Sequence, residues 1–186
     1  MLSLCPAVES QSKEQGVRCI VDRGNIYIYS GDGHGKSPAA WGRAIQAAAE
    51  GKKVVIIQFL KGKSMTDSEF LRRLEPEIKL IQFEKAEENF EELTEARKQE
   101  EIGNIRNGLN YAKKVLNVSE CDLLILDEVL GLIDNEIISK EELKTLVDNR
   151  HDTDVILTGV KLEDDICFMA DEVSKIETVK FKVWEM

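Results

Sequence analysis

The sequence predicts an α/β fold in which a mostly parallel sheet is flanked by helices. Short apolar runs rich in β-branched residues alternate along the chain with segments of helical pattern, as they do in βαβ units. Val54–Leu60 and Leu123–Leu126 are almost continuously apolar, which is typical of parallel strands covered on both faces. With 186 residues the chain is long enough for one such domain and too short for two ordinary ones. In this fold class, ligands bind at the carboxyl ends of the strands.

The expected elements follow one another from residue 24 to residue 186. A first strand, Ile26–Tyr29, stops at a cluster of glycines, and the Ala-rich helix that follows, Ala39–Glu50, is closed by Gly51. Further strands are expected at Val54–Leu60, Ile78–Phe83, Leu123–Leu126 and Val155–Leu157, with a strand-like segment over Val173–Val183. One or two amphipathic helices are expected within Glu87–Leu116, and further helices at Lys140–Val147 and Asp164–Glu172. Residues 1–23 are mixed and polar, and we expect them to form an N-terminal arm.

Composition limits the classes of partner. Hydrophobic residues make up 42% and charged residues 32% of the chain, as in globular proteins, and the formal net charge is −10. A surface of that sign repels phosphate backbones and anionic lipids, so neither nucleic acid nor a membrane is expected as a partner. The four cysteines have no metal-ligand spacing and fit reduced thiols. Because no signal-peptide pattern or membrane-spanning run is found either, the protein is expected to be cytoplasmic.

The strongest functional signal is the loop after the first strand, Ser30-Gly31-Asp32-Gly33-His34-Gly35-Lys36-Ser37. Its three glycines let backbone N–H groups approach phosphate oxygens, and the helix that follows places its positive terminus there. Lys36 adds a charge, and the Ser37 hydroxyl is placed to bind Mg²⁺. Ser30 stands where the G-x-x-x-x-G-K-[ST] pattern has glycine, so the match is a variant; the alternative is a Gly-rich turn that happens to precede a lysine. The predicted ATP contacts are Ser30, Gly31, Asp32, Gly33, His34, Gly35, Lys36, Ser37 and Pro38, in a P-loop nucleotide-binding domain over residues 24–186.

Asp127 and Glu128 form the second signal, at the end of an apolar strand. A carboxylate at that place would lie across from Ser37 and reach hydrated Mg²⁺, which prefers oxygen ligands. Taken alone, an acidic pair after a strand is more often a simple turn. Because it follows a phosphate loop at a suitable interval, we predict Ser37, Asp127 and Glu128 as the metal site.

These motifs, with their flanking residues, resemble the ATP:corrinoid adenosyltransferase family. The resemblance covers about residues 24–180 and includes the loop, Ala39-Ala40-Trp41-Gly42 after it, and the Gln58-Phe59-Leu60-Lys61-Gly62 segment. Leu124–Glu128, Asn149-Arg150 and Ile156–Gly159 continue it in the same order. The Gln58–Gly62 segment and the serine that opens the loop are more specific than a general P-loop.

The resemblance implies a P-loop, RecA-like fold and a definite reaction. A Co(I) corrinoid attacks the 5′ carbon of ATP, a carbon–cobalt bond forms, and triphosphate leaves. Lys36, the loop amides and Mg²⁺ would stabilise the charge on the leaving group. Ser37 and Glu128 would hold Mg²⁺, and Phe90 matches a family aromatic residue near the corrinoid. Lys36 and Phe90 are therefore the predicted catalytic residues. The resemblance also suggests a homodimer, a reductase that supplies Co(I), and a place in adenosylcobalamin synthesis or salvage.

The sequence departs from the family pattern at several positions. His34 replaces a common lysine, Pro38 a threonine, and Gln46 a helix arginine, for which Arg43 could substitute one turn away. Glu92 stands in place of a tryptophan, and Val160 in place of the arginine of a Thr-Gly-Arg motif. Lost positive charge near a triphosphate weakens its binding. Two alternatives therefore stay open: a catalytically weak relative that binds ATP or a corrinoid, and another P-loop enzyme such as a kinase or ATPase.

Overall fold

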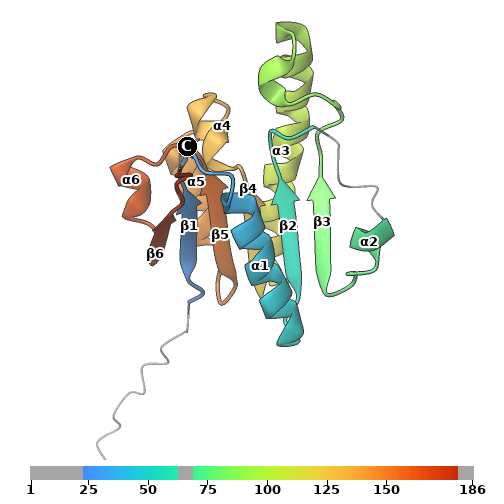
Figure 1. Ribbon diagram of the computed structural model, residues 1–186, viewed down its shortest axis with the longest axis vertical. Coiled ribbons are helices and arrows are strands. Elements are labelled where there is room, and N and C mark those ends of the chain that lie inside the picture. The colour runs from blue at the N-terminus through green and yellow to red at the C-terminus, as the bar shows by residue number, and fades with distance from the viewer. Residues whose placement is uncertain (1–22, 63–68, 180–186) are drawn as a thin grey trace, which may run out of the picture.

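The computed structural model describes residues 23–62 and 69–179, which form a six-stranded sheet with helices on both faces (Figure 1). The strand order is β3-β2-β4-β5-β1-β6, and all paired strands are parallel, so the predicted fold class is confirmed. The strands are β1 (Ile26–Ser30), β2 (Val54–Gln58), β3 (Ile78–Gln82), β4 (Leu123–Asp127), β5 (Asp154–Gly159) and β6 (Glu172–Lys175).

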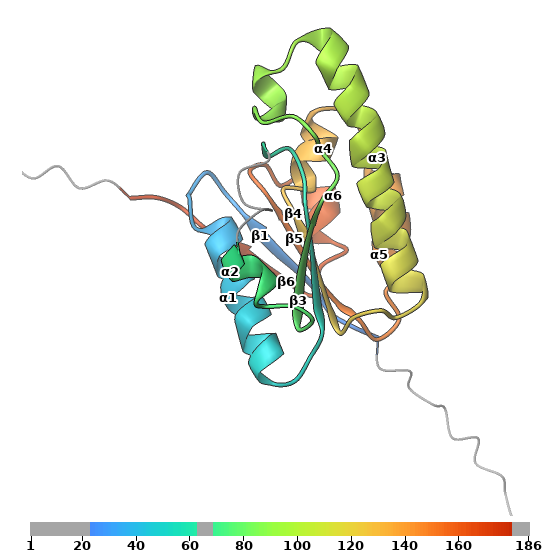
Figure 2. The same cartoon turned by 90° about the vertical axis from the view of Figure 1, so that its right-hand side faces the viewer.

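The helices form a layer on each side of the sheet. Figure 2 shows α1 (Lys36–Ala49) and α2 (Glu69–Arg72) on one side, and α3 (Glu95–Asn117), α4 (Leu130–Asp134) and α5 (Lys140–Asp148) on the other. A 3₁₀ turn, η1 (Phe90–Glu92), and the start of α3 extend beyond the carboxyl ends of the strands (Figure 1). The last helix, α6 (Asp164–Cys167), precedes β6. No helix in the described ranges is long and apolar enough to cross a bilayer.

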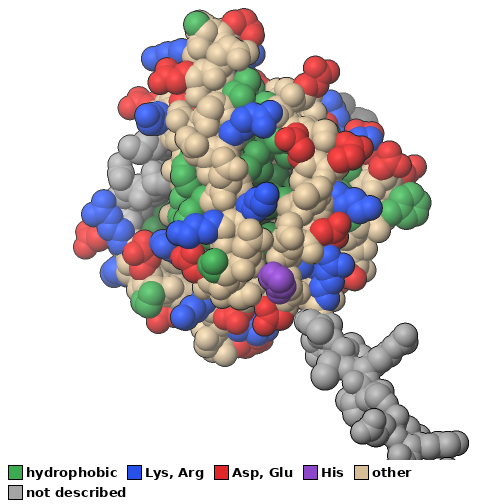
Figure 3. All heavy atoms as spheres, turned by 180° about the vertical axis from the view of Figure 1, so that it is seen from behind, with side chains coloured by type: hydrophobic (Ala, Val, Ile, Leu, Met, Phe, Trp, Pro, Cys, Tyr) green, Lys and Arg blue, Asp and Glu red, His purple; other side chains and the backbone are tan. Residues whose placement is uncertain are grey.

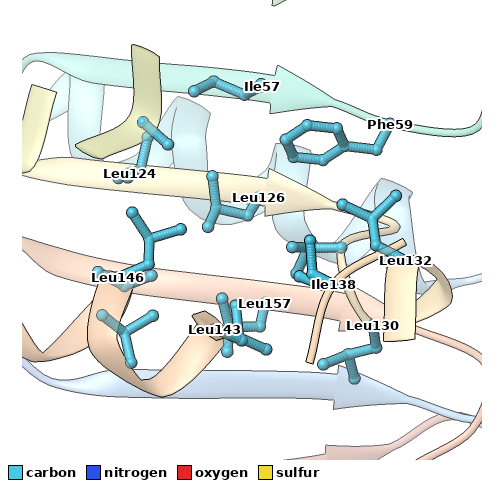
Figure 4. Close-up of a cluster of buried hydrophobic side chains, with 14 of the residues drawn as sticks. Ile57, Phe59, Leu124, Leu126, Leu130, Leu132, Ile138, Leu143, Leu146 and Leu157 are labelled. Atoms are coloured by element: carbon cyan, nitrogen blue, oxygen red, sulfur yellow. The ribbon is translucent and has the colours of Figure 1, made fainter. Parts of the chain in front are cut away.

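The two faces of the sheet are packed differently. Under α1 the core contains the small side chains Ala40, Ala44 and Ala47, which let the helix lie close to Ile56 and Ile125 of the sheet. The other face is packed by large aliphatic side chains, each of which contributes roughly 1.5–3 kcal/mol when fully buried. Figure 4 shows the centre of this second cluster, with Ile57, Phe59, Leu124, Leu126, Leu130, Leu132, Ile138, Leu143, Leu146 and Leu157 labelled. Burial on both faces explains why β2 and β4 are almost continuously apolar.

On the outer side of that layer, α3 and α5 border a groove. Leu109, Ile138, Leu143 and Leu146 are among its lining residues. Figure 3 views the molecule from behind and shows apolar side chains in the hollow between ridges of charged ones. The groove lies over the face of the sheet that α3 and α5 cover. Its lining residues belong to these two helices, together with Ile138 just before α5.

The structure corrects several expected elements. The helix expected over Asp164–Glu172 ends at Cys167, because Asp171 pairs with β1: its Oδ2 accepts the Ile26 N–H at 2.7 Å and its N–H donates to Ile26 O at 2.8 Å. Glu87–Leu116 contains η1 and one long helix, and the sequence did not predict α2 or α4. Residues 1–22 of the expected arm and the end of the Val173–Val183 segment lie outside the described residues.

Candidate nucleotide-binding site

The glycine loop is closed against the chain that follows β6. Gly31 has a φ of +120°, and a Cβ added there would lie 2.2 Å from the carbonyl oxygen of Ile176. The Gly33 N–H donates to that same oxygen at 3.2 Å, and the Ile176 N–H donates to Ser30 O at 2.7 Å. The Gly31 N–H donates to Val160 O at 3.1 Å. Glycine is therefore required at position 31 by backbone conformation and by close approach.

The ammonium group of Lys36 lies inside the glycine loop. It is the first residue of α1, it is 7% exposed, and its Nζ donates to Gly31 O at 2.7 Å and to Gly33 O at 3.0 Å. These loop carbonyls hold the ammonium inside the turn, close to the backbone N–H groups of the loop. An anion that entered the loop would meet this charge together with the amino end of the helix. Asp32, His34 and Pro38 are exposed, while Ser30 is buried at the end of β1.

Asp127, the last residue of β4, collects four hydrogen bonds across the carboxyl ends of the strands. Ser37 Oγ at 2.8 Å and Thr158 Oγ1 at 2.7 Å donate to its Oδ1. Gln58 Nε2 at 2.9 Å and Lys61 Nζ at 2.8 Å donate to its Oδ2. Burial by itself would raise the pKa of Asp127, which is 1% exposed, but the charge of Lys61 and these hydrogen bonds hold that pKa below its ordinary value. The carboxylate is thus ionised and oriented toward Ser37.

Glu128 follows in a left-handed conformation, with a φ of 60°. Its N–H donates to Thr158 Oγ1 at 2.8 Å, so the hydroxyl that supports Asp127 also fixes the turn after it. Burial raises the pKa of the Glu128 carboxyl, and the charges of Lys61 and Lys36 act in the opposite direction. The turn therefore places a second carboxylate within the field of both lysines.

The donor set fits Mg²⁺ in kind. The Ser37 hydroxyl and the Asp127 carboxylate are hard oxygen donors, and the two side chains already touch. Within the described ranges, no group of three or more His, Cys, Asp or Glu residues could hold a metal by themselves. A magnesium ion here would complete its shell with phosphate oxygens and water, as Mg²⁺ usually does in nucleotide sites.

A second loop, Leu60–Gly62, lies next to this cluster. Leu60 also has a left-handed φ of 60°, and its N–H donates to Glu84 Oε1 at 2.9 Å. Gln82 Nε2 donates to Lys61 O at 3.0 Å, and the Phe90 N–H donates to Leu60 O at 3.4 Å. The end of β3 and the η1 turn therefore fix the backbone from which the Lys61 side chain reaches Asp127.

Phe90 occupies a different position from the other candidate residues. It is 6% exposed and belongs to the large hydrophobic cluster, with Lys98 Nζ 5.9 Å from its ring centroid. The ring is packed inside the domain, and the residue touches the site through its backbone bond to Leu60. Glu92, which replaces the family tryptophan, accepts the Asn89 N–H at 3.3 Å and closes the η1 turn.

Arg43 lies beside Gln46, the residue that replaces the family's helix arginine. Its guanidinium lies over the ring of Tyr27 at 5.6 Å, and it lines a pocket with Gln46, Leu123 and Asp154. Leu123 and Asp154 are the first residues of their strands, so this pocket lies at the opposite ends of the strands from the glycine loop. Val160, by contrast, is 49% exposed and directly contacts the loop through its carbonyl.

Gln58, Lys61 and Thr158 were not predicted as site residues, although they bind Asp127 directly. Gln58 and Thr158 are polar residues near the ends of otherwise apolar strands, and Lys61 follows shortly after one. A polar side chain at the carboxyl end of a buried parallel strand faces the ligand edge of the sheet. That rule would have identified Gln58 and Thr158; the contact made by Lys61 depends on the left-handed turn at Leu60.

A parallel sheet, a glycine loop between its first strand and a helix, and Lys36-Ser37 at the helix start define a P-loop α/β domain. The solved structure of a KaiC-like protein from Pyrococcus horikoshii OT3 has a related fold, with a TM-score of 0.54, 19% identity, and coverage of 83% of this chain and 73% of that one. This likeness agrees with a RecA-like arrangement.

The family itself is shown by sequence. The model of the family described as ATP:corrinoid adenosyltransferase BtuR/CobO/CobP matches residues 22–185. The corrinoid adenosyltransferase of Escherichia coli (strain K12) is 33% identical over 160 residues, covering 86% of this chain and 79% of the relative. Corrinoid adenosyltransferase CobA of Salmonella typhimurium is 30% identical over 181 residues, covering 91% and 89%. The chain therefore belongs to the ATP:corrinoid adenosyltransferase family, a family of transferases, and the resemblance is confirmed.

Proposed function

We propose that this protein transfers the 5′-deoxyadenosyl group of ATP to the Co(I) centre of a corrinoid. The cobalt supplies an electron pair to the 5′ carbon, a carbon–cobalt bond forms, and the bond from that carbon to the triphosphate oxygen breaks. Triphosphate leaves with the electrons of that bond. The proposal rests on family membership together with one local observation: Lys36 lies in the glycine loop while Ser37 of the same helix turn is bonded to Asp127.

The loop would act on the leaving group. Lys36 is held 2.7 Å and 3.0 Å from two loop carbonyls, and the Gly31 and Gly33 N–H groups donate to Val160 O and Ile176 O. The loop would exchange these contacts for phosphate oxygens when it binds a triphosphate, which brings the charge of Lys36 to bear on the leaving group. Charge grows on that triphosphate as the carbon–oxygen bond breaks, and fixed positive groups stabilise the transition state more than the ground state. Ser37, Asp127 and Glu128 would hold Mg²⁺, which supplies additional positive charge to the phosphates.

The corrinoid is assigned to the side of the site away from the glycine loop, near Leu60–Gly62 and η1. Phe90 would act there through packing, because its ring is buried and its N–H supports Leu60. The same proposal includes a homodimer, cytoplasmic location, a role in adenosylcobalamin synthesis or salvage, and a reductase partner that supplies Co(I). Residues 1–23 are proposed as an arm attached to the nucleotide-binding domain of residues 24–186.

One observation favours a catalytically weak relative as the second candidate. Val160 contacts the loop where the family pattern has arginine. The site therefore lacks, among the described residues, a positive charge that the family pattern would place beside the loop. Charge-assisted hydrogen bonds contribute roughly 1.5–3 kcal/mol each, which would show as weaker ATP binding.

The test is incubation of the protein with ATP, Mg²⁺ and chemically reduced cobalamin or cobinamide. We expect a light-sensitive adenosylated corrinoid and triphosphate in equal amounts, measured by absorbance and ion chromatography. Lys36→Ala should lower ATP affinity by roughly tenfold to a hundredfold, the size of one lost charge-assisted bond. Lys79→Ala is the matched control, because this half-exposed lysine pairs with Glu120 near the amino ends of the strands.

Other outcomes separate the alternatives. Inorganic phosphate without an adenosylated product would indicate an ATPase, and ATP binding without any product would favour the binding protein. Unchanged ATP affinity in Lys36→Ala would remove the glycine loop from the proposed site.

A further inference from the structure

The ammonium group of Lys61 lies between the two oxygen donors assigned to the metal. Its Nζ is 2.7 Å from Ser37 Oγ and 2.8 Å from Asp127 Oδ2. The Asp127 side chain is 2% exposed and that of Lys61 33% exposed, so the ion pair joins a buried carboxylate to a cation with a path to solvent. An ammonium and a magnesium ion compete for such oxygens because both are cations that need them as partners.

The position of Lys61 is built by residues outside the ion pair. Gln82 Nε2 donates to the carbonyl oxygens of Lys61 at 3.0 Å and of Gly62 at 3.4 Å. Glu84, 7% exposed, accepts the Leu60 N–H and keeps Leu60 in its left-handed conformation. A buried carboxylate and a side-chain amide therefore support the backbone directly under Lys61, which distinguishes it from an ordinary surface lysine.

We propose that Lys61 is a built-in competitor of the divalent cation. In the cation-free protein its ammonium compensates the Asp127 carboxylate and holds the Ser37 hydroxyl in place. When Mg²⁺ enters with the nucleotide, the ammonium leaves these two oxygens and the ion takes them. This inference rests on the proposed nucleotide site and goes beyond it, because it assigns to Lys61 a positioning role that controls when the cation can bind.

The exchange couples the cation to the nucleotide. Free Mg²⁺ must displace the ammonium from Asp127, and Glu128, the other carboxylate in the field of Lys61, is itself assigned to the ion. When ATP is present, its phosphates add oxygen ligands for the ion and also offer the released ammonium a negative partner. The competitor therefore weakens binding of Mg²⁺ alone more than binding of Mg²⁺ with ATP.

The test compares wild type, Lys61→Met and Lys61→Gln. The first measurement is the rise in melting temperature caused by Mg²⁺ without nucleotide. The second is the Mg²⁺ concentration that half-saturates binding of a fluorescent ATP analogue. Without nucleotide we expect both variants to need about tenfold less Mg²⁺, the effect of removing one charge-assisted competitor of roughly 1.4 kcal/mol. With the ATP analogue the decrease should be smaller. Lys79→Met, which removes the same charge from the other end of the sheet, should behave as wild type.

The outcomes decide whether Lys61 competes with Mg²⁺, and they distinguish a failure of this inference from a failure of the proposed function. An unchanged or increased Mg²⁺ requirement in both variants overturns the inference, as does an equal decrease in Lys79→Met, which would indicate a general charge effect. The glutamine variant keeps a polar group beside Asp127 in case the methionine variant folds poorly. If wild type does not bind ATP, the proposed function fails, while the melting series with Mg²⁺ alone still tests the competition.

Discussion

The two loops that meet at the carboxyl ends of the strands are held by different means. The glycine loop is fixed by backbone: the Ile176 carbonyl accepts from Gly33, the Ile176 N–H bonds Ser30, and Lys36 bonds two loop carbonyls. Its requirements are the absence of a Cβ and the presence of one ammonium. Such requirements can be met in many proteins, which is why a glycine loop alone indicates only a phosphate site.

The Leu60–Gly62 loop is held by side chains of β3 and the segment after it, with buried carboxylates among them. Glu84 accepts the Leu60 N–H, and Glu101 of α3 accepts the N–H groups of Lys85 and Ala86 just beyond β3. Burying a carboxylate is unfavourable unless its oxygens are hydrogen-bonded, so these positions depend on particular side chains. The comparison teaches that the phosphate half of the site depends mainly on backbone, whereas the half assigned to the corrinoid depends on particular buried side chains.

The largest effect is expected from filling the backbone-held loop. Gly31→Ala would place a Cβ 2.2 Å from Ile176 O in a residue whose φ is +120°. The loop must open to relieve this contact, so we expect a loss of about 3 kcal/mol or more in unfolding free energy and loss of ATP binding. Urea denaturation and nucleotide titration measure the two effects.

Gly103→Ala is the matched control for that substitution. Nothing lies within 4 Å of a Cβ added there, and the residue is exposed within α3. Alanine should raise stability by up to about 1 kcal/mol, since glycine is the poorer helix former. If both alanine variants were equally stable, the loop would not be held by its backbone as described.

A smaller effect is expected from neutralising the carboxylates beside the second loop. Both oxygens of Glu101 accept N–H bonds, from Lys85, Ala86 and Asn104, so Glu101→Gln turns one acceptor into a donor that faces donors. We expect a loss of about 1–2 kcal/mol in the free energy of unfolding.

Glu84 differs because its Oε2 is buried with no hydrogen-bond partner. Glu84→Gln should therefore keep or raise stability at neutral pH, as urea denaturation would measure.

The contribution of Glu84 to the free energy of unfolding should depend on pH. Burial raises the pKa of its carboxyl above the ordinary value, with the charge of Glu101 adding to the rise and the Leu60 N–H opposing it. The folded protein thus binds this proton more tightly than the unfolded chain. The resulting stability is present below the ordinary pKa of about 4.5 and is lost as pH rises through the raised value. The fall should vanish in Glu84→Gln, and a fall of the same size in both proteins would contradict this assignment.

The elements that the sequence predicted well were those set by local pattern. The apolar runs of β2 and β4 predicted buried parallel strands, and the Gly31–Ser37 pattern predicted a loop between a strand and a helix. Family membership was also readable from these motifs. In each case the signal lies in consecutive residues whose spacing matches one kind of structure.

What the sequence did not predict depends on contacts between distant segments. The helical pattern after Asp164 does not continue through Asp171, because Asp171 pairs with β1. Its partner there, Ile26, is 145 residues away in the sequence. The role of Lys61 depends on a left-handed turn that is supported by Glu84, 24 residues beyond Leu60. Neither contact leaves a periodic trace in the residues concerned.

The smallest effect should come from adding charge to the glycine loop. Val160 is 49% exposed and its carbonyl accepts the Gly31 N–H, so Val160→Arg would add a guanidinium next to the glycine loop without disturbing the core. We expect ATP to bind about fivefold tighter, roughly 1 kcal/mol, because one exposed charge facing a triphosphate is partly screened by solvent. Val118→Arg adds the same charge at the end of α3, where Val118 is 59% exposed, and should leave affinity unchanged. The gain in Val160→Arg should shrink as salt is added, because salt screens an exposed charge. An equal gain in both variants would show that net charge, and not a charge placed beside the loop, strengthens ATP binding.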